Sequence, residues 1–476
     1  MENIILIMAD QFRGDMLGVS GNPCTVTPNI DNLAGDGCYF ENGYSPSPTC
    51  VPARACLITG KKPATTGFFS NDFSVEWEFD ETLMQSLKNA GYQTINVGKN
   101  HFHPLRKSLG FEQNYIYEVA NDEKNQPSDY HRWLMHETNG QVYDTAKAFD
   151  PNAWTVEPWT GNPRLHPTEW TADKALDCLD MRDPTRPFYL QVSFQRPHPP
   201  LDPPVNLLDY FNDVEIPVPP VATWAPEFVE DTLDIHPFEG VIGKEALKRA
   251  RKAYYAAVMH IDEQVGKIIS YLHRHKLWDS TTVFFVSDHG ELLGDHNMFR
   301  KGPAYEGSSR IPYVVKFSKG IAEDWRGKKV LIPVTLLDVF PTCATIAEAK
   351  LPEGLDGLAI QDLLSGNGKR EYIFGENYRA NKQVRTGGMF VVGKGFKYIW
   401  NSVSGVEQLF DLRVDRKEMH DLSEESSLKP VLEKMRKVVI EEYRTRPYDG
   451  MLDENGNLAS DRCLPAYRKS QPVEKE

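Results

Sequence analysis

Short apolar runs alternate with amphipathic segments from the N-terminus to about residue 300. Apolar runs bounded by polar residues are typical of buried strands, and apolar positions that recur every three or four residues are typical of helices. The pattern predicts strands over 3–8, 93–97, 188–194 and 282–287, and helices over 28–35, 81–90, 169–181 and 245–275. Because strands that alternate with helices form parallel sheets, we expect an α/β sandwich with a large, mostly parallel central sheet flanked by helices.

The C-terminal part of the chain has a different pattern. The segment 196–226 is rich in proline and is expected to run over the surface. Glycines and β-forming residues over 384–411 predict an antiparallel meander, which a helix over 426–445 and a polar tail follow. We therefore expect an N-terminal α/β domain (1–370) and a smaller C-terminal α+β domain (371–476), built from an antiparallel sheet with a helix.

The charge balance limits the classes of partner. The 476 residues carry a formal net charge of −14, with a sequence pI near 5.5. This acidity argues against nucleic acid and against a membrane surface as partners, and no run is apolar and long enough to span a bilayer. The seven cysteines show no C-x-x-C spacing, and the N-terminal segment lacks the basic region and cleavage site of an export signal. We expect a cytoplasmic protein with free thiols.

Polar pairs follow two of the predicted strands directly. Asp10-Gln11 comes after strand 3–8, and Asp288-His289 comes after strand 282–287. Ligands of open α/β sheets bind beyond the carboxyl ends of strands, and these side chains offer oxygen and nitrogen ligands for a divalent cation. Either pair alone fits an Asp that caps a following helix or turn. Two such pairs at equivalent strand ends favour a metal site.

Cys50 lies at a predicted helix start. Pro52 suits the first turn of a helix, where backbone N–H groups and the helix dipole favour an anion. Arg54, one turn further on, adds a fixed positive charge near the same point. A small buried residue and an ordinary reactive thiolate are the alternative interpretations of Cys50.

The segment 50–60 resembles the signature of the type I sulfatases, a family of the alkaline phosphatase-like superfamily. The family motif is C-x-P-x-R, and this chain has Ala53 where Ser is usual. The resemblance implies that Cys50 is converted to formylglycine (3-oxoalanine). It also implies a maturation partner, either a formylglycine-generating enzyme or an anaerobic sulfatase-maturing enzyme.

The two strand-end pairs also resemble sulfatase motifs, in the segments 8–11 and 287–291. The resemblance implies one divalent cation held by Asp10, Gln11, Cys50, Asp288 and His289. Many sulfatases have Asp-Asp and Asp-Asn at these pairs, so Gln11 and His289 make the site less anionic and slightly softer. Calcium is the expected ion, and manganese is the alternative.

Three further segments resemble the family's catalytic motifs. Gly98-Lys99-Asn100-His101 is similar to the Gly-Lys-x-His motif, which implies that Lys99 contacts the formylglycine and that His101 takes a proton from it. Pro197-His198-Pro199-Pro200 is similar to the Pro-His-x-Pro segment, which implies that His198 binds sulfate and serves the leaving group. Leu293-Gly294-Asp295-His296, followed by Arg300-Lys301-Gly302, is similar to the stretch that ends in a sulfate-binding lysine, which implies that Lys301 binds sulfate. The implied catalytic set is Cys50, Arg54, Lys99, His101, His198 and Lys301.

This resemblance implies a sulfuric ester hydrolase that releases sulfate from an aryl or carbohydrate ester. The implied partner is a sulfated small molecule or saccharide. A phosphonate or phosphate ester hydrolase of the same superfamily is the nearest alternative, because Asp10-Gln11 and Asp288-His289 are similar to pairs in phosphonate monoester hydrolases. A non-catalytic binding protein on the same scaffold is a second alternative, which the complete catalytic set disfavours.

Overall fold

An eight-stranded sheet forms the centre of the computed structural model, which describes residues 2–119, 127–148, 152–234, 237–378, 387–446 and 450–468. The strands lie in the order β5-β4-β6-β1-β7-β8-β2-β9. Their bounds are β1 Asn3–Ala9, β2 Cys38–Phe40, β4 Gln93–Gly98, β5 Gln113–Ile116, β6 Phe188–Phe194, β7 Thr281–Val286, β8 Tyr313–Lys316 and β9 Lys328–Val330.

Most of this sheet is parallel. The five strands from β5 to β7 in that order run in one direction, whereas β8 is antiparallel to its neighbours β7 and β2. The register aligns Gly98, Ser193, Met8 and Val286 across β4, β6, β1 and β7. The carboxyl ends of these four strands therefore lie side by side, and the predicted mostly parallel sheet is confirmed.

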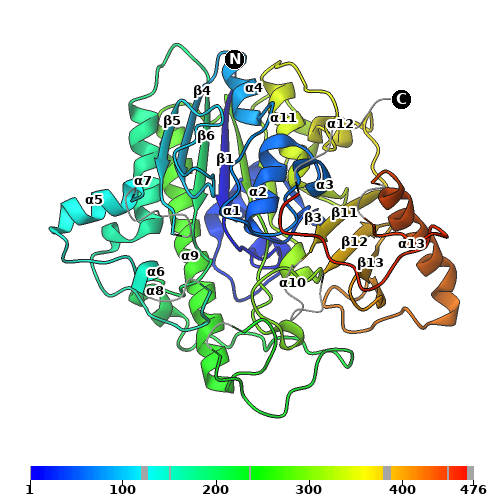
Figure 1. Cartoon of the computed structure of the whole chain (residues 1–476). Helices are drawn as coiled ribbons and strands as arrows, with labels where there is room; N and C mark the ends of the chain where they lie inside the picture. The colour runs from blue at the N-terminus through cyan, green and yellow to red at the C-terminus, as the bar shows by residue number, and fades with distance from the viewer. Residues whose placement is uncertain are drawn as a thin grey trace.

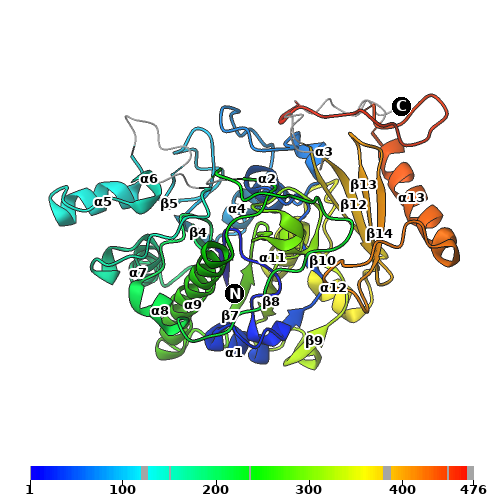
Figure 2. The same ribbon diagram turned by 90° about the horizontal axis from the view of Figure 1, so that it is seen from below.

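Helices cover both faces of the sheet (Figures 1 and 2). Side chains of β1 alternate between two cores, as the twofold period of a strand requires. Ile5 and Ile7 pack with helices of one face, and Ile4 and Leu6 pack with helices of the other. The first face carries α1 Pro28–Asp36, α7 Pro167–Asp180 and α9 Lys244–Arg274; the second carries α2 Cys50–Thr59, α4 Leu83–Asn89 and α11 Val339–Ile346.

A separate four-stranded antiparallel sheet follows in the C-terminal part. It consists of β11 Tyr372–Asn377, β12 Gly388–Gly393, β13 Phe396–Asn401 and β14 Glu407–Asp411, in that order. Helix α13 Lys429–Arg444 packs on one face of it through Leu432, Met435 and Val439. This sheet and α13, coloured orange to red, lie at one side of the molecule in both views (Figures 1 and 2).

The four long strands and four helices predicted from the pattern are all present within a few residues of their predicted bounds. The short strands β2, β5, β8 and β9 were not predicted, because their few residues carry too little periodicity. The proline-rich segment contains one short helix, α8 Val205–Tyr210. The meander begins earlier than predicted, at β11, and residues 384–386 and the tail 469–476 lie outside the described part. The domain division at 370 stays a prediction. Among the described residues, we find no helix that combines the length and the apolar composition needed to cross a membrane.

Candidate active site

The polar residues singled out in the sequence converge at one edge of the large sheet. Asp10 follows β1, Asp288 lies two residues after β7, and Lys99 follows β4. The loop that carries His198 begins after β6. Because β4, β6, β1 and β7 are consecutive neighbours, the four strand ends bring these side chains into one buried cluster, where each is at most 5% exposed.

Cys50 is the first residue of α2, with Pro52 in the first turn of that helix. Its Sγ lies 3.0 Å from Nε2 of His289 and 4.0 Å from Oδ1 of Asp10. The Nδ1 of His289 lies 2.9 Å from the carbonyl oxygen of Gly290. A carbonyl only accepts, so Nδ1 carries a proton and Nε2 is the ring nitrogen that faces Cys50. Burial tends to lower the pKa of His289, but Asp288, Cys50 and Asp10 outweigh it and raise that pKa to about 9.

Arg54 joins the two strand-end carboxylates. Its Nη2 donates to Oδ2 of Asp10 at 3.0 Å, and its Nε donates to Oδ2 of Asp288 at 2.9 Å. The same guanidinium donates to the carbonyl of Lys99 and to Oγ of Ser193. All these groups are buried, so Arg54 fixes the relative positions of the four strand ends of β1, β7, β4 and β6 as well as contributing charge.

Lys301 and Gln11 form a second group next to Cys50. The Nζ of Lys301 donates to Oε1 of Gln11 at 2.6 Å and lies 2.7 Å from Nε2 of His198. The amide nitrogen of Gln11 donates to Glu291, a bond that fixes the orientation of the amide. In this structure the amide oxygen of Gln11 therefore faces Lys301, and its role as a metal ligand stays a prediction.

His101 is held by a carboxylate. Its Nδ1 lies 2.9 Å from Oε2 of Glu118, and its backbone N–H donates to the same oxygen at 3.0 Å. Both residues are buried, and Phe73 packs edge-on against the imidazole. Burial tends to raise the pKa of Glu118, but His101 and Lys99 outweigh it and lower that pKa to about 2. The ionised carboxylate keeps the proton of a neutral His101 ring on Nδ1.

The buried cations of the cluster stabilise negatively charged groups within it. Burial tends to raise the pKa of Asp10, yet Lys99 (Nζ to Oδ2 2.6 Å), His198 and Arg54 hold it well below its usual range. Burial and Asp10 tend to raise the pKa of the Cys50 thiol, but Lys301 and other cations lower it well below its ordinary value. A group at the position of Cys50 is therefore stabilised in an anionic form.

Four of these side chains could hold a metal ion. One ligand atom each from Asp10, Cys50, Asp288 and His289 can be chosen so that all four lie within 4.8 Å of one another. Burial and the charge of Asp10 raise the pKa of Asp288, so the two carboxylates repel each other. A divalent cation would relieve that repulsion, and Nε2 of His289 already faces the cluster, where it would bind the cation after losing its proton. The donor set fits a cation of the calcium or manganese class.

Comparison with protein families agrees with this geometry. The family model described as Sulfatase matches residues 2–349, and the model described as N-sulphoglucosamine sulphohydrolase, C-terminal, matches residues 294–445. The chain belongs to the sulfatase family. The predicted fold class and superfamily are thereby confirmed.

Named relatives of this sulfatase support its activity. The chain is 36% identical over 468 residues to an arylsulfatase of Clostridium perfringens, covering 95% of this chain and 96% of the relative. It is 29% identical over 452 residues to a choline-sulfatase of Rhizobium meliloti, covering 89% and 82% of the two chains. The sulfatase is therefore a sulfuric ester hydrolase.

Solved structures share the fold of the sulfatase. The phosphonate monoester hydrolase of Agrobacterium radiobacter matches with a TM-score of 0.78 at 23% identity, covering 96% of this chain and 99% of that one. An enzyme in complex with its substrate D-glucosamine-2-N,6-O-disulfate matches with a TM-score of 0.74 at 21% identity, covering 94% and 99%. At these identities the matches show the fold alone.

Two residues of the site were not singled out in the sequence. Glu118 follows the unpredicted strand β5, and recognition of that strand would have placed it beside Lys99. Asn377 is the last residue of β11; it accepts from Oγ1 of Thr49 at 3.1 Å and donates to the carbonyl of Gly302 at 3.2 Å. No local pattern marks an asparagine that reaches a site from another sheet.

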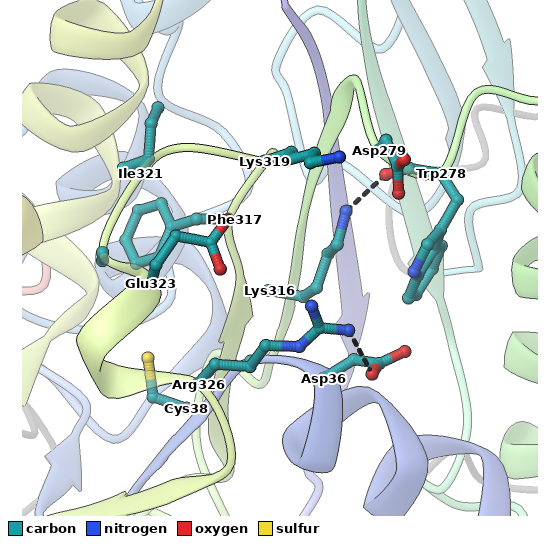
Figure 3. A pocket seen from close by; sticks show the side chains of 12 residues that line it. Asp36, Cys38, Trp278, Asp279, Lys316, Phe317, Lys319, Ile321, Glu323 and Arg326 are labelled. Atoms are coloured by element: carbon teal, nitrogen blue, oxygen red, sulfur yellow. Dashed lines mark hydrogen bonds and ion pairs between the residues drawn. The ribbon is translucent and has the colours of Figure 1, made fainter.

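A separate pocket of about 270 Å³ lies at the opposite edge of the large sheet (Figure 3). Its wall includes Trp278, just before β7, and Lys316, the last residue of the antiparallel strand β8. Lys316 donates to the carbonyl oxygen of Thr281 at 3.0 Å, and Arg326 pairs with Asp36. Because the carboxyl ends of β1 and β7 lie at the other edge, this pocket is not part of the sulfatase site.

Proposed function

We propose that this sulfatase hydrolyses aryl or carbohydrate sulfate esters with a formylglycine derived from Cys50 and one calcium ion. The observation that carries the proposal is the environment of Cys50. Two carboxylates and the imidazole of His289 lie on one side of it, and Lys301 forms the adjoining group. Charged neighbours of this kind do not stabilise an uncharged buried cysteine. They do stabilise a sulfate group that is bound beside a cation.

When bound, the cation supplies a Lewis acid and the formylglycine supplies a hydrated aldehyde as the nucleophile. The residues that would hold the cation are Asp10, Asp288 and His289, with the residue at position 50; Gln11 would join them by turning its amide oxygen away from Lys301. Manganese stays the alternative, since one imidazole and one amide soften the oxygen set.

The buried cations bind and orient the sulfate group. Lys301 is directed toward the cluster from the loop after β7, and Lys99 from the end of β4, where its Nζ contacts Asp10. Arg54 acts through Asp10 and Asp288, whose positions it fixes. Preorganised charges in a buried site lower the barrier without reorganisation during the reaction.

His101 is the proposed proton acceptor at the nucleophile. With its proton on Nδ1 and bonded to Glu118, a neutral ring presents the lone pair of Nε2 as a base. The carboxylate of Glu118 then stabilises the imidazolium that forms, as the buried Asp does in a serine protease triad. Glu118 is thus a positioning residue for His101.

His198 and Lys301 are the proposed pair at the leaving oxygen. A sulfate ester releases a poor alkoxide, so a proton must reach that oxygen as the bond breaks. Because Nδ1 of His198 faces the carbonyl of Pro199, its Nε2 accepts a hydrogen bond from Nζ of Lys301, which supports Lys301 as the source of this proton. Protonation of the alcohol by His198 requires transfer from Lys301, so the two act as one unit.

Position 50 also defines the partner needed for maturation. A formylglycine-generating enzyme or an anaerobic sulfatase-maturing enzyme would have to act before folding, because Cys50 is only 2% exposed in the fold. The arylsulfatase relative favours an aryl sulfate as the first substrate to test.

A side-by-side assay tests the proposed function. Enzyme co-expressed with a maturing enzyme would be given an aryl sulfate, an aryl phosphate diester and an aryl phosphonate with the same phenol. We expect kcat/KM to be highest for the sulfate. A preference for the phosphonate would favour the alternative hydrolase, and no turnover of any ester would favour the binding protein.

A further inference from the structure

The loop that carries His198 has few backbone donors of its own. Five of the eight residues over 197–204 are prolines, which have no N–H to donate. The N–H of His198 donates to the carbonyl of Asp10 at 3.2 Å, and the N–H of Asp202 donates to the carbonyl of Pro200 at 3.0 Å. With so few donors, the loop depends on side chains to fix its shape.

Arg196 and Asp202 close this loop as an ion pair. Nε of Arg196 donates to Oδ1 of Asp202 at 2.6 Å, and Nη2 donates to Oδ2 at 2.7 Å. The two residues lie on either side of His198 in the sequence, and each is at most 2% exposed. Two parallel bonds between a guanidinium and a carboxylate fix both the distance and the angle between them.

Both members of this pair are charged. Burial tends to lower the pKa of Arg196, but Asp202 outweighs it and raises that pKa well above its ordinary value. Burial likewise tends to raise the pKa of Asp202, yet Arg196 holds it well below its usual range. Desolvation of two buried charges offsets much of their attraction, so the pair is better suited to fixing geometry than to adding stability.

Asp202 is itself anchored to the core. Its carboxylate accepts from the hydroxyl of Thr145, and its backbone carbonyl lies 3.2 Å from Nε2 of His166. The Nδ1 of His166 accepts from the backbone N–H of Thr168, so Nε2 is the nitrogen that donates. His166 directly precedes α7, which packs on one face of the large sheet. Arg196 is therefore paired with a fixed carboxylate.

We propose that Arg196 is a positioning residue for His198, because its ion pair with Asp202 sets where the imidazole lies relative to Lys301 and the leaving oxygen. The inference rests on the proposed function, since it takes His198 and Lys301 as the pair at that oxygen. Their nitrogens are 2.7 Å apart, and transfer of a proton along such a contact is lost when one partner moves. Arg196 acts through His198 and makes no contact with the sulfate.

The test uses matured full-length enzyme and the variant Arg196→Lys. A lysine keeps a positive charge beside Asp202 and Asp144, which lies 4.0 Å from Nη2 of Arg196, but it cannot form the two parallel bonds. In a series of aryl sulfates, we expect kcat for weakly acidic phenols to fall about 10–100-fold. For the most acidic phenol, which needs no proton, kcat and KM should stay within about threefold of the wild type. Asp202→Asn should give the same pattern.

Arg370 provides the matched control. Its Nη1 and Nη2 donate to the two carboxylate oxygens of Asp338 at 2.5 and 2.6 Å, and the side chains are 9% and 0% exposed. This pair holds the start of α11 and lies outside the active-site cluster. Arg370→Lys should lower the melting temperature about as Arg196→Lys does, while the dependence of kcat on the leaving group stays that of the wild type.

A double variant tests whether Arg196 acts through His198. If it does, Arg196→Lys combined with His198→Ala should be no slower than His198→Ala alone on weakly acidic phenols, because the positioned group is already gone. Losses that multiply in the double variant would overturn the proposal. A rise in KM that is equal across the whole series would also overturn it, since that pattern belongs to a residue that binds the sulfate.

Nitrogen NMR with isotope-labelled histidine reads the ring of His198 without turnover, and His198→Ala assigns its signals. We expect a protonated Nδ1 and an unprotonated Nε2 in the wild type, with both resonances shifted or broadened in Arg196→Lys and unchanged in Arg370→Lys. Unchanged His198 resonances in Arg196→Lys would overturn the proposal. Hydrolysis of a phosphonate but of no sulfate ester would defeat the proposed function, and the resonances would still decide the role of Arg196.

Discussion

The Nζ of Lys301 lies 2.7 Å from Nε2 of His198, and both side chains are buried. On its other side, Nδ1 of His198 lies 2.8 Å from the carbonyl oxygen of Pro199, so Nδ1 must carry the ring proton. Burial, Lys301 and Lys99 lower the pKa of His198 to about 3. The imidazole is therefore a hydrogen-bond acceptor for the lysine, and the pair holds one transferable proton at Lys301.

The first prediction concerns this pair. Lys301→Ala should lower kcat/KM by about 10²–10³-fold, because it removes a cation and the proton for the leaving oxygen. His198→Ala should lower it most for esters of weakly acidic alcohols, since those depend most on protonation. The measurement is kcat/KM against leaving-group pKa for a series of aryl sulfates. The exposed Lys319→Ala, in the remote pocket, is the matched control; an unchanged slope in His198→Ala would contradict the assignment.

The second prediction concerns His101 and Glu118. His101→Ala should release about one equivalent of alcohol per enzyme and then slow by about 10²–10⁴-fold, because release of sulfate needs the base. Glu118→Gln should lower kcat about 10–100-fold with little change in KM, since an amide still orients the ring but does not stabilise its cation. Burst kinetics would measure both. The exposed Glu137→Gln is the control, and wild-type turnover in Glu118→Gln would rule out the positioning role.

The third prediction concerns maturation at Cys50. After co-expression with a maturing enzyme, mass spectrometry of the peptide containing Cys50 should show an aldehyde in place of the thiol. Cys50→Ala should abolish turnover without changing thermal stability much, because the side chain is small. Cys463→Ala removes an exposed thiol from the same chain as a control. Full activity of Cys50→Ala would remove the basis of the mechanism.

The fourth prediction concerns the cation. Metal analysis of mature enzyme should find one calcium per chain, and chelation should lower activity in a way that calcium restores. Asp288→Asn should lower kcat/KM by about 100-fold or more, because it weakens both the cation site and the bond from Arg54. Stronger restoration by manganese would select the alternative ion. Activity that survives complete removal of metal would contradict the site.

The sequence was most informative at the ends of long buried strands. Asp10 and Asp288 were predictable because each closely follows a continuous apolar run, and parallel strands bring such ends to one edge. Cys50 and Arg54 were recognisable from local spacing at a helix start. The motifs around Lys99 and His198 came from the resemblance, and the structure places them at the same edge as the first group.

The sequence pattern could not predict contacts between side chains that are far apart in the sequence. Glu118 was missed because β5 is short and polar, with Gln113 and Asn114 in place of an apolar run. Asn377 reaches the site from the C-terminal sheet, a contact that no periodicity encodes. The amide of Gln11 turns toward Lys301, and its orientation depends on Glu291, which is 280 residues away in sequence. Such contacts depend on tertiary packing.

The last prediction concerns a buried carboxylate between the C-terminal sheet and the catalytic loops. Glu418 accepts from the backbone of Glu306 and lies 3.0 Å from Nζ of Lys397, which also contacts Glu306 at 3.1 Å. One lysine thus serves two acids, with Arg416 at 3.4 Å from Glu306 as a second cation. Burial and the charge of Glu306 outweigh Lys397 and raise the pKa of Glu418 from 4.5 to about 7.

A raised pKa makes the folded state bind a proton that the unfolded state releases. The bound proton of Glu418 therefore stabilises the folded state fully below about pH 4.5, and this stabilisation is lost as pH rises through about 7. Its upper limit is about 3 kcal/mol of unfolding free energy. The free energy of unfolding of the wild type should therefore decrease between pH 5 and pH 8 more than that of Glu418→Gln, in which Lys397 keeps its contact with Glu306. Urea unfolding at both pH values measures this difference, with the exposed Glu424→Gln as control. Equal pH dependence in wild type and Glu418→Gln would show that Glu418 stays ionised in the fold, so that Lys397 neutralises both acids at once.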